Sequence, residues 1–291
     1  MYTKPDLSRR LIVAPNVTTP DAISLIDQFA HLVAYIEITP WQLHASGAQL
    51  SNFIHQSKAK CFLGSAVCTS PKTASKIVTS MTELRVDIIT VSSLGSIPML
   101  EAAQEAATKA AAEQAKFADM STEKYGKPLV IATLPGLDYD ELVEIGVFPE
   151  TFWSEPEKYA AEIAKEKEKK LLRFLLGLVS AAKKAGLDGI VVPAWMTAIV
   201  WGLRLVKEPT GSPFLIIAKG ITDLAMANQA VLDGADLVIV GDAICNAPDP
   251  VAAAKEFNRV ILEALITMVP GPETTLTQAD FCSPPLMSPA S

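Results

Sequence analysis

Short runs of apolar and β-branched residues recur along the chain, separated by amphipathic helical stretches. The runs are continuous rather than alternating, as is typical of strands in a parallel sheet that is covered on both faces. We expect strands over residues 11–17, 33–39, 59–66, 86–92, 128–134, 188–194, 214–220 and 236–242. Strands that alternate with helices in this way predict an α/β fold, a single-domain (β/α)8 barrel.

Two segments depart from the regular alternation of strand and helix. The connection over residues 135–170 is the longest and ends in a charged helix, so it predicts an extended loop after the fifth strand. The last segment, 269–291, is rich in Pro, Ser and Thr and has few groups to bury. We therefore expect a barrel over residues 1–268, followed by a C-terminal tail that is a mobile arm or a strap across a neighbour.

Composition and charge narrow the class of partner. A formal net charge of −7 and the absence of a basic stripe argue against a nucleic-acid or acidic-membrane partner. The N-terminus has no apolar signal segment, and the uncharged stretch 189–203 is shorter than a membrane span and divided by Pro193. The 4 cysteines fall at no zinc-binding or Cys-x-x-Cys spacing, and no metal-ligand cluster appears. We expect a cytoplasmic protein with reduced thiols, a small-molecule substrate, and neither metal nor cofactor.

Several segments, taken in order, resemble the orotidine 5′-monophosphate decarboxylase superfamily, which includes the 3-hexulose-6-phosphate synthases. IEITPWQLHASG (36–47) is similar to the second-strand exit of the synthases, and SPKTA (70–74) is similar to the residues after the decarboxylase catalytic motif. AGLDGIVVPA and GADLVIVGDAICNAPDP are similar to the sixth and eighth units. The resemblance runs from about residue 11 to 262 and implies a barrel that forms a homodimer, with each site near the subunit interface.

The chain departs from the family at the residues that perform its chemistry. Aligned through SPKTA, the Asp-x-Lys-x-x-Asp motif of the third strand falls on Gly64, Ala66 and Thr69, which offer neither a titratable proton nor an anionic oxygen. After the last strand, Asp242 follows Gly241 where the decarboxylases carry a phosphate-binding Arg. A carboxylate beside a phosphate dianion would cost a few kcal/mol. We therefore expect a substrate that is not a phosphate monoester.

Three charged residues near the carboxyl ends of strands are the catalytic candidates, because these ends form the active face of such barrels. Glu37, between Ile36 and Ile38, is either a buried acid with a structural partner or a general base whose pKa burial raises. Lys219 either pairs with Asp242 on the adjacent strand or acts on the substrate as an electrophile, a proton donor or the partner of a carboxylate. Its positive charge is also a possible replacement for the phosphate-binding Arg. Asp242 either caps the helix that follows or orients Lys219.

Further residues at the strand exits are candidates for substrate binding. The aromatic candidates, Trp41 and Trp195, are either core residues or the lining of a pocket for an aromatic or lipid-like substrate. The polar and glycine candidates are Asn16, Ser65, Ser92, Thr133, Gly220 and Gly241.

Two functions from different classes fit this sequence. The first is a repurposed biosynthetic enzyme, lyase-like, that acts on a non-phosphorylated carbonyl or carboxylate compound by decarboxylation, retro-aldol cleavage or cyclisation. The second is a catalytically inactive barrel that serves as a binding or scaffolding subunit, and an orotidylate decarboxylase with replaced residues is a remote third. An open cavity at the carboxyl end of the barrel, lined by Glu37 or Lys219 with a perturbed pKa, would favour the enzyme. A carboxyl end filled with side chains would favour the scaffold.

Overall fold

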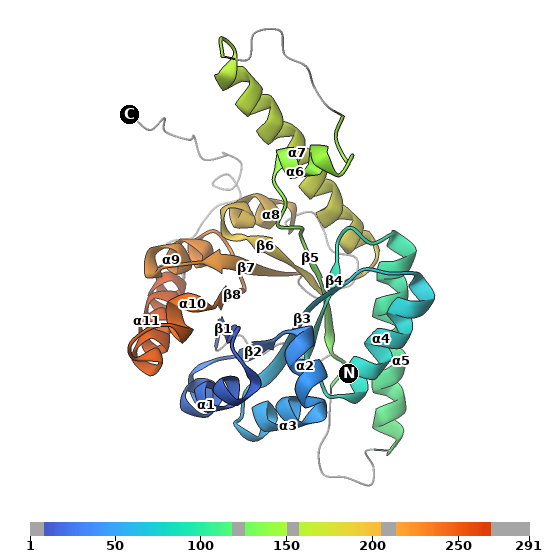
Figure 1. The fold of residues 1–291 in the computed structure, drawn as a ribbon, viewed down its shortest axis with the longest axis vertical. Coiled ribbons are helices and arrows are strands. Elements are labelled where there is room, and N and C mark those ends of the chain that lie inside the picture. The colour runs from blue at the N-terminus through green and yellow to red at the C-terminus, as the bar shows by residue number, and fades with distance from the viewer. Residues whose placement is uncertain (1–8, 118–125, 150–156, 205–213, 269–291) are drawn as a thin grey trace, which may run out of the picture.

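Eight parallel strands close into a barrel in the order β1 to β8 (Figure 1). The structure is a computed structural model that describes residues 9–117, 126–149, 157–204 and 214–268. It confirms the predicted (β/α)8 barrel, and every predicted strand segment overlaps an observed strand, with β3 and β7 each ending one residue beyond the predicted segment. The strands are β1 (Leu11–Val13), β2 (Tyr35–Ile38), β3 (Lys60–Val67), β4 (Ile88–Ser92), β5 (Leu129–Thr133), β6 (Gly189–Pro193), β7 (Leu215–Ile221) and β8 (Leu237–Val240).

Helices surround the strands and cover the outer face of the sheet (Figure 1). In the extended connection after β5, a short helix leads to the longest one, whose first turns project away from the barrel. The helices are α1 (Thr19–Phe29), α2 (Pro40–Ser46), α3 (Ala48–Gln56), α4 (Pro71–Glu83), α5 (Ile97–Phe117), α6 (Tyr139–Glu144), α7 (Ala160–Lys184), α8 (Thr197–Arg204), α9 (Leu224–Leu232), α10 (Asp242–Cys245) and α11 (Pro250–Met268), with 3-10 turns at Ala30–Leu32 and Ala194–Met196.

Both faces of the sheet are buried, in two separate apolar clusters. Alternate residues of each strand point into the barrel, and the residues between them pack against the helices. This arrangement explains the continuous apolar runs, because both faces of the sheet are shielded from water over most of each strand. The cluster inside the barrel consists of Ile12, Tyr35, Phe62, Ile88, Leu129, Ile131, Val191, Leu215, Ile217 and Leu237.

An aspartate immediately before each of β4, β6 and β8 ties the amino end of the barrel together. Each carboxylate accepts a hydrogen bond from a backbone N–H at the start of the preceding strand, so each pair of neighbouring strands is joined below the core. The three bonds are Cys61 N to Asp87 Oδ2 (2.7 Å), Val130 N to Asp188 Oδ2 (2.8 Å) and Ile216 N to Asp236 Oδ2 (2.9 Å). These bonds support strands at the face of the barrel that serves stability rather than catalysis.

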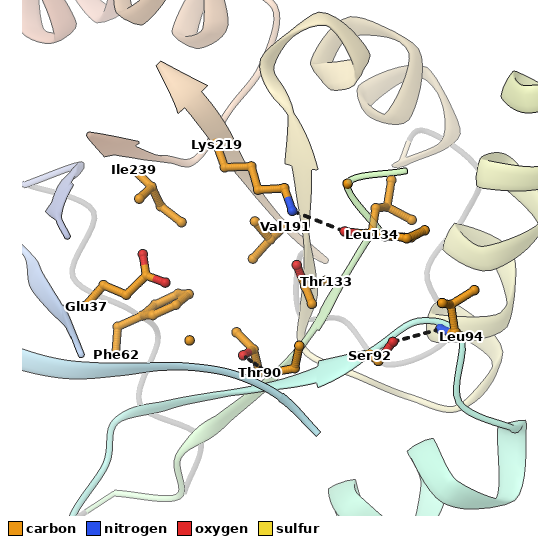
Figure 2. A pocket seen from close by; sticks show the side chains of 14 residues that line it. Glu37, Phe62, Thr90, Ser92, Leu94, Thr133, Leu134, Val191, Lys219 and Ile239 are labelled. Carbon is orange, nitrogen blue, oxygen red and sulfur yellow. Dashed lines mark hydrogen bonds between the residues drawn. The ribbon is translucent and has the colours of Figure 1, made fainter. Parts of the chain in front are cut away.

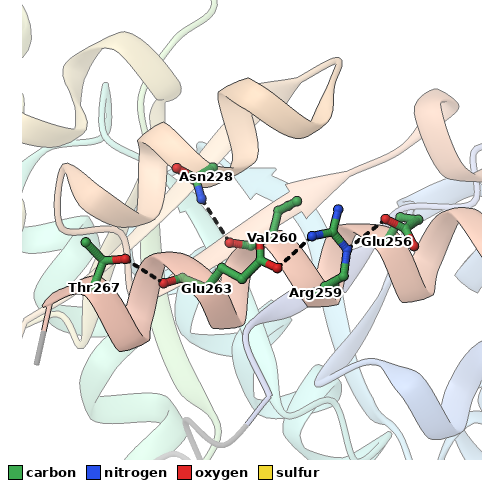
Figure 3. A network of polar contacts seen from close by, with 6 residues as sticks. All are labelled: Asn228, Glu256, Arg259, Val260, Glu263 and Thr267. Atoms are coloured by element: carbon green, nitrogen blue, oxygen red, sulfur yellow. Dashed lines mark hydrogen bonds and ion pairs between the residues drawn. The ribbon is translucent and has the colours of Figure 1, made fainter.

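Helices α9 and α11 pack side by side, and one side-chain bond joins them across their contact (Figure 3). The amide of Asn228 on α9 donates to the carbonyl of Val260 on α11 at 3.0 Å. Farther out on α11, Arg259 donates to Glu256 and Glu263 at 2.9 and 2.6 Å. Arg259 and both acids are exposed, so their ion pairs contribute little to stability. The hydrogen bond from the Asn228 side chain, in contrast, satisfies a partly buried backbone carbonyl.

The apolar stretch 189–203 forms β6, a 3-10 turn and most of α8. Within the described ranges, no helix is long and apolar enough to cross a membrane. Cys61, Cys68 and Cys245 are free thiols, whereas Cys282 and the predicted tail at 269–291 lie outside the described residues.

Candidate active site

The carboxyl end of the barrel holds a cavity of about 510 Å³ (Figure 2). Its walls come from β2 through β8 and from the loops after β4 and β5, and the rim residues Leu94 and Gly136 are exposed to solvent. The lining residues are Glu37, Phe62, Gly64, Ala66, Thr90, Ser92, Leu94, Thr133, Leu134, Pro135, Gly136, Val191, Lys219 and Ile239.

Two lining side chains carry charge, and they come from strands that are separated by β8 and β1 around the barrel. Glu37 extends from β2 and Lys219 from β7, and Figure 2 shows them on separate walls of the cavity. Lys219 Nζ donates to the carbonyl oxygen of Leu134 at 3.1 Å. Within the described part of the chain, no salt bridge joins Glu37 to Lys219 and no hydrogen bond reaches the Glu37 carboxyl group. Both groups therefore face the cavity without contacting each other.

Both charged groups have displaced pKa values. Burial raises the pKa of Glu37 to about 7, and the positive charge of Lys219 opposes this rise. Burial also lowers the pKa of Lys219, and the charge of Glu37 opposes that fall. A carboxyl group with a pKa near 7 accepts and releases a proton at neutral pH, which is the property that a general acid–base catalyst requires.

The uncharged end of β3 forms a wall of the cavity with its backbone. The pairing of β3 with β4 shifts register between Leu63 and Val67, and Ala66 adopts a left-handed backbone with φ 45°. Thr90 supports this bulge, because its hydroxyl accepts the N–H of Ala66 at 2.9 Å and donates to the carbonyl of Leu63 at 3.0 Å. Ser65 Oγ donates to the Thr90 carbonyl at 2.9 Å. The residues of this strand end that line the cavity are Phe62, Gly64 and Ala66, so β3 offers the cavity no polar side chain of its own.

Comparison with known proteins identifies the family to which this barrel belongs. The family model described as Orotidine 5'-phosphate decarboxylase / HUMPS family matches residues 9–257. The chain belongs to this family. It is 24% identical over 265 residues to the orotidine 5'-phosphate decarboxylase of Carboxydothermus hydrogenoformans, covering 86% of this chain and 95% of that one. It is 26% identical over 262 residues to the orotidine 5'-phosphate decarboxylase of Moorella thermoacetica, covering 84% and 89%.

Solved structures share the fold. The crystal structure of orotidine 5'-phosphate decarboxylase from Lactobacillus acidophilus superimposes with a TM-score of 0.66 at 19% identity, covering 87% of this chain and 99% of that one. An uncharacterized conserved protein from Geobacillus kaustophilus superimposes with a TM-score of 0.63 at 18% identity, covering 86% and 99%. At these identities the likeness concerns the fold, and the family membership inferred from sequence resemblance is confirmed by the family model.

The cavity brings together four of the residues predicted for the site in this member of the family. Glu37, Lys219, Ser92 and Thr133 all line it. Ser92 and Thr133 are partners in the register of β4 and β5, so their side chains lie on neighbouring strands. The hydroxyl of Ser92 accepts the N–H of Leu94 at 3.3 Å. The sequence identified these residues by their position at strand ends, and their roles stay predictions.

The other predicted binding residues are not among those that line the cavity. Ser65 belongs to the alternate set of β3 residues that faces away from the barrel interior and bonds to Thr90. Asn16, Trp41 and Trp195 lie in the connections after β1, β2 and β6, and all three are exposed, Trp41 to 47% and Trp195 to 57%. Gly220 lies within β7 with φ 78°, and Gly241 is the N-cap residue of α10.

Asp242 does not take either of the places expected for it. It is the first residue of α10 and is exposed, and Gly241 occupies the N-cap position without a side-chain cap. Lys219 bonds to the Leu134 carbonyl rather than to Asp242. The register of β7 and β8 gives the reason, because Val240 pairs with Ile221, so Asp242 lies beyond Lys219 along the barrel.

The sequence reasoning did not identify several residues that line the cavity. Phe62, Val191 and Ile239 form the apolar floor of the cavity, but in sequence they are ordinary members of apolar strands. The Leu134 carbonyl is a backbone group, for which the sequence carries no signal. Thr90 is a detectable exception, because it is a polar residue inside the otherwise apolar run 88–91.

A second acid at the β7–β8 side of the mouth also escaped notice. Asp223 follows β7 and caps α9, accepting the N–H of Met226 at 2.8 Å. Asp242 begins α10 directly after β8. The helix starts that follow these two adjacent strands therefore each carry a carboxylate, which opposes the binding of an anion there.

Proposed function

We propose that this family member is a lyase-type enzyme that acts on a small, non-phosphorylated carbonyl or carboxylate compound. Glu37 and Lys219 are its acid–base pair. The observation that carries the proposal is that two ionisable groups with displaced pKa values share one cavity at the carboxyl end of the barrel. Groups of this kind cluster at functional sites, because catalysis needs protons to move near neutral pH.

The two walls of the cavity suit the two halves of such a reaction. The Lys219 ammonium, held toward the cavity by the Leu134 carbonyl, pairs with a carbonyl or carboxylate oxygen of the substrate. When the bond to a departing carboxylate breaks, its electron pair moves into the adjacent carbonyl, and Lys219 stabilises the resulting enolate. Glu37 in its acid form then protonates the carbon, and water restores its proton. In a retro-aldol cleavage, Glu37 as a carboxylate instead removes the hydroxyl proton, and a new carbonyl forms as the carbon–carbon bond breaks. The electron pair of that bond forms an enolate that Lys219 stabilises, and Glu37 returns the proton to its carbon.

The rest of the lining indicates what the substrate looks like. Phe62, Val191 and Ile239 offer an apolar floor, and Ser92 and Thr133 add hydroxyl groups beside it. One ammonium faces one carboxyl group, so the site suits a ligand with a single negative charge rather than a dianion. A cavity of about 510 Å³ lies within the usual range for small-molecule sites.

Two observations support a substrate without a phosphate group. The resemblance implies that the family holds phosphate at the exits of the seventh and eighth strands, and here Asp223 and Asp242 begin the helices at those exits. Lys219 does not compensate for them, because its ammonium reaches into the cavity toward Leu134.

The rival function is a catalytically inactive scaffold, favoured by the absence of ionisable side chains at Gly64, Ala66 and Thr69. The cavity argues against a scaffold, because a barrel without catalytic activity gains nothing from two buried ionisable groups that face an open cavity. Burying a charge without a partner costs free energy, so the pair is more readily explained by use.

A substrate panel tests the proposal. Wild type, Glu37→Gln and Lys219→Ala are incubated with β-keto acids and β-hydroxy ketones, and product formation is followed by NMR and carbon dioxide release. We expect turnover of a non-phosphorylated compound that falls roughly 100-fold or more in each variant. Lys109→Ala, which removes an exposed lysine of α5, is the matched control and should keep full activity.

Three outcomes would contradict the proposal. Turnover of orotidine 5′-monophosphate or of a hexulose 6-phosphate in the same assay would show that the phosphate chemistry survives. Full activity in both cavity variants would remove Glu37 and Lys219 from the mechanism. A wild-type protein that turns over no member of the panel would favour the scaffold.

A further inference from the structure

Gly64 on β3 lies directly beneath the carboxyl group of Glu37. The strands β2 and β3 pair Glu37 with Phe62, so Gly64 is the next residue of β3 on the same face of the sheet. A Cβ atom at position 64 would lie 3.1 Å from Glu37 Cδ and 3.4 Å from its Cγ, and closer still to Oε1. The carboxyl group thus occupies the space that any side chain at position 64 would fill.

The backbone at position 64 does not by itself call for glycine. Gly220 and Gly47 have positive φ angles of 78° and 54°, which favour glycine, whereas Gly64 is not among the residues with positive φ. Two positions later Ala66 adopts φ 45° without being glycine. The reason for glycine at 64 is therefore space rather than backbone conformation.

We propose that Gly64 is the positioning residue of this site: its missing side chain creates the gap that receives the Glu37 carboxyl group and holds it in the cavity opposite Lys219. No hydrogen bond holds that carboxyl group within the described residues, so its place depends on packing in this gap and on the charge of Lys219. Figure 2 shows the Glu37 side chain beside the ring of Phe62, with its carboxyl end directed into the cavity. The inference rests on the proposed function in one respect, that Glu37 is the acid–base group.

Gly64→Ala tests the inference without a substrate. The Glu37 carboxyl group is followed by carbon-13 NMR as a function of pH, and its signal is assigned by its loss in Glu37→Gln. In wild type we expect a midpoint near 7, because burial raises the pKa of Glu37. In Gly64→Ala the carboxyl group moves toward water or toward Lys219, and either displacement favours its charged form, so we expect the midpoint to fall by at least about one pH unit. Gly136→Ala is the matched control, because Gly136 lines the same cavity and a Cβ there meets nothing within 4 Å.

A double-mutant cycle keeps the inference testable if the single variant folds poorly. The clash exists between position 64 and Glu37, so Gly64→Ala should lower Tm more in the wild-type background than in Glu37→Ala, where the carboxyl group is gone. Equal losses in the two backgrounds would refute the inference. In Glu37→Ala, Gly64→Asp should return a carboxyl group to the same gap and restore a raised titration midpoint.

The outcomes separate this inference from the proposed function. An unmoved midpoint in Gly64→Ala overturns the positioning role and leaves the catalytic assignment intact. A moved midpoint supports the positioning role whether or not a substrate is turned over. A Gly136→Ala protein that shifts the midpoint as strongly as Gly64→Ala would also overturn it, because cavity volume rather than contact would then control the carboxyl group.

Discussion

Replacing Glu37 with glutamine isolates the free energy of placing a charged carboxylate inside the barrel. Burial raises the pKa of Glu37 from its ordinary 4.5 to about 7. Below pH 4.5 the group is protonated in both the folded and the unfolded chain, and it has no effect on stability. Between pH 4.5 and 7 the unfolded chain releases the proton while the folded protein retains it, so the free energy of unfolding falls as pH rises. Above pH 7 the folded state bears the whole penalty.

The size of this penalty follows from the change in pKa. Each pKa unit corresponds to about 1.4 kcal/mol, so a rise from 4.5 to about 7 corresponds to about 3 kcal/mol. The cavity is open to solvent, which makes this figure an upper value. Glutamine has nearly the same shape and stays neutral, so Glu37→Gln should match the pH dependence of a protein without the penalty.

Urea denaturation at pH values from 4 to 8 measures the effect. We expect the difference in free energy of unfolding between Glu37→Gln and wild type to increase in favour of the variant by up to about 3 kcal/mol, with most of the change between pH 4.5 and 7. Glu101→Gln, at an exposed position of α5, controls for the loss of one surface charge. A difference that stays flat with pH, or that grows in favour of wild type above pH 7, would refute the claim that burial raises the pKa of Glu37.

Two further predictions concern the scaffold of the site. Asp188→Ala leaves the backbone N–H of Val130 and the ammonium of Lys127 without this acceptor, so we expect the free energy of unfolding, measured by urea denaturation, to fall by about 3 kcal/mol. Asp188→Asn keeps an oxygen acceptor and should lose less stability, and equal losses in the two variants would contradict the explanation. Thr90→Val removes the hydroxyl that supports the left-handed backbone of Ala66, so we expect the free energy of unfolding to fall by about 2 kcal/mol. Thr90→Ser should be close to wild type in stability, and a valine variant as stable as wild type would show that the bulge needs no side-chain support.

The barrel itself was predictable because its signal is local. Each strand is a short β-branched apolar run, and each helix between strands repeats apolar residues at helical spacing, so length and order alone lead to the (β/α)8 fold. The starts of some helices can also be predicted from neighbouring residues in the sequence. Ser70, followed by Pro71, caps α4 and accepts the N–H of Thr73. Glu37 and Lys219 were identifiable for a related reason, because a charge at the end of an apolar strand is conspicuous.

The sequence by itself thus determined which strand ends carry charged residues, but only the tertiary structure decided which side chains meet. Both faces of these strands are apolar, so the pattern does not tell which alternate set points into the barrel. Gly64 lines the cavity while its neighbour Ser65 faces away, and Lys219 bonds to a carbonyl of another strand end rather than to Asp242. Gly64 and Lys219 share the faces of Phe62 and Ile217, which lie in the cluster inside the barrel, and the closure of the barrel by strands that are far apart in the chain decides which face is the inner one.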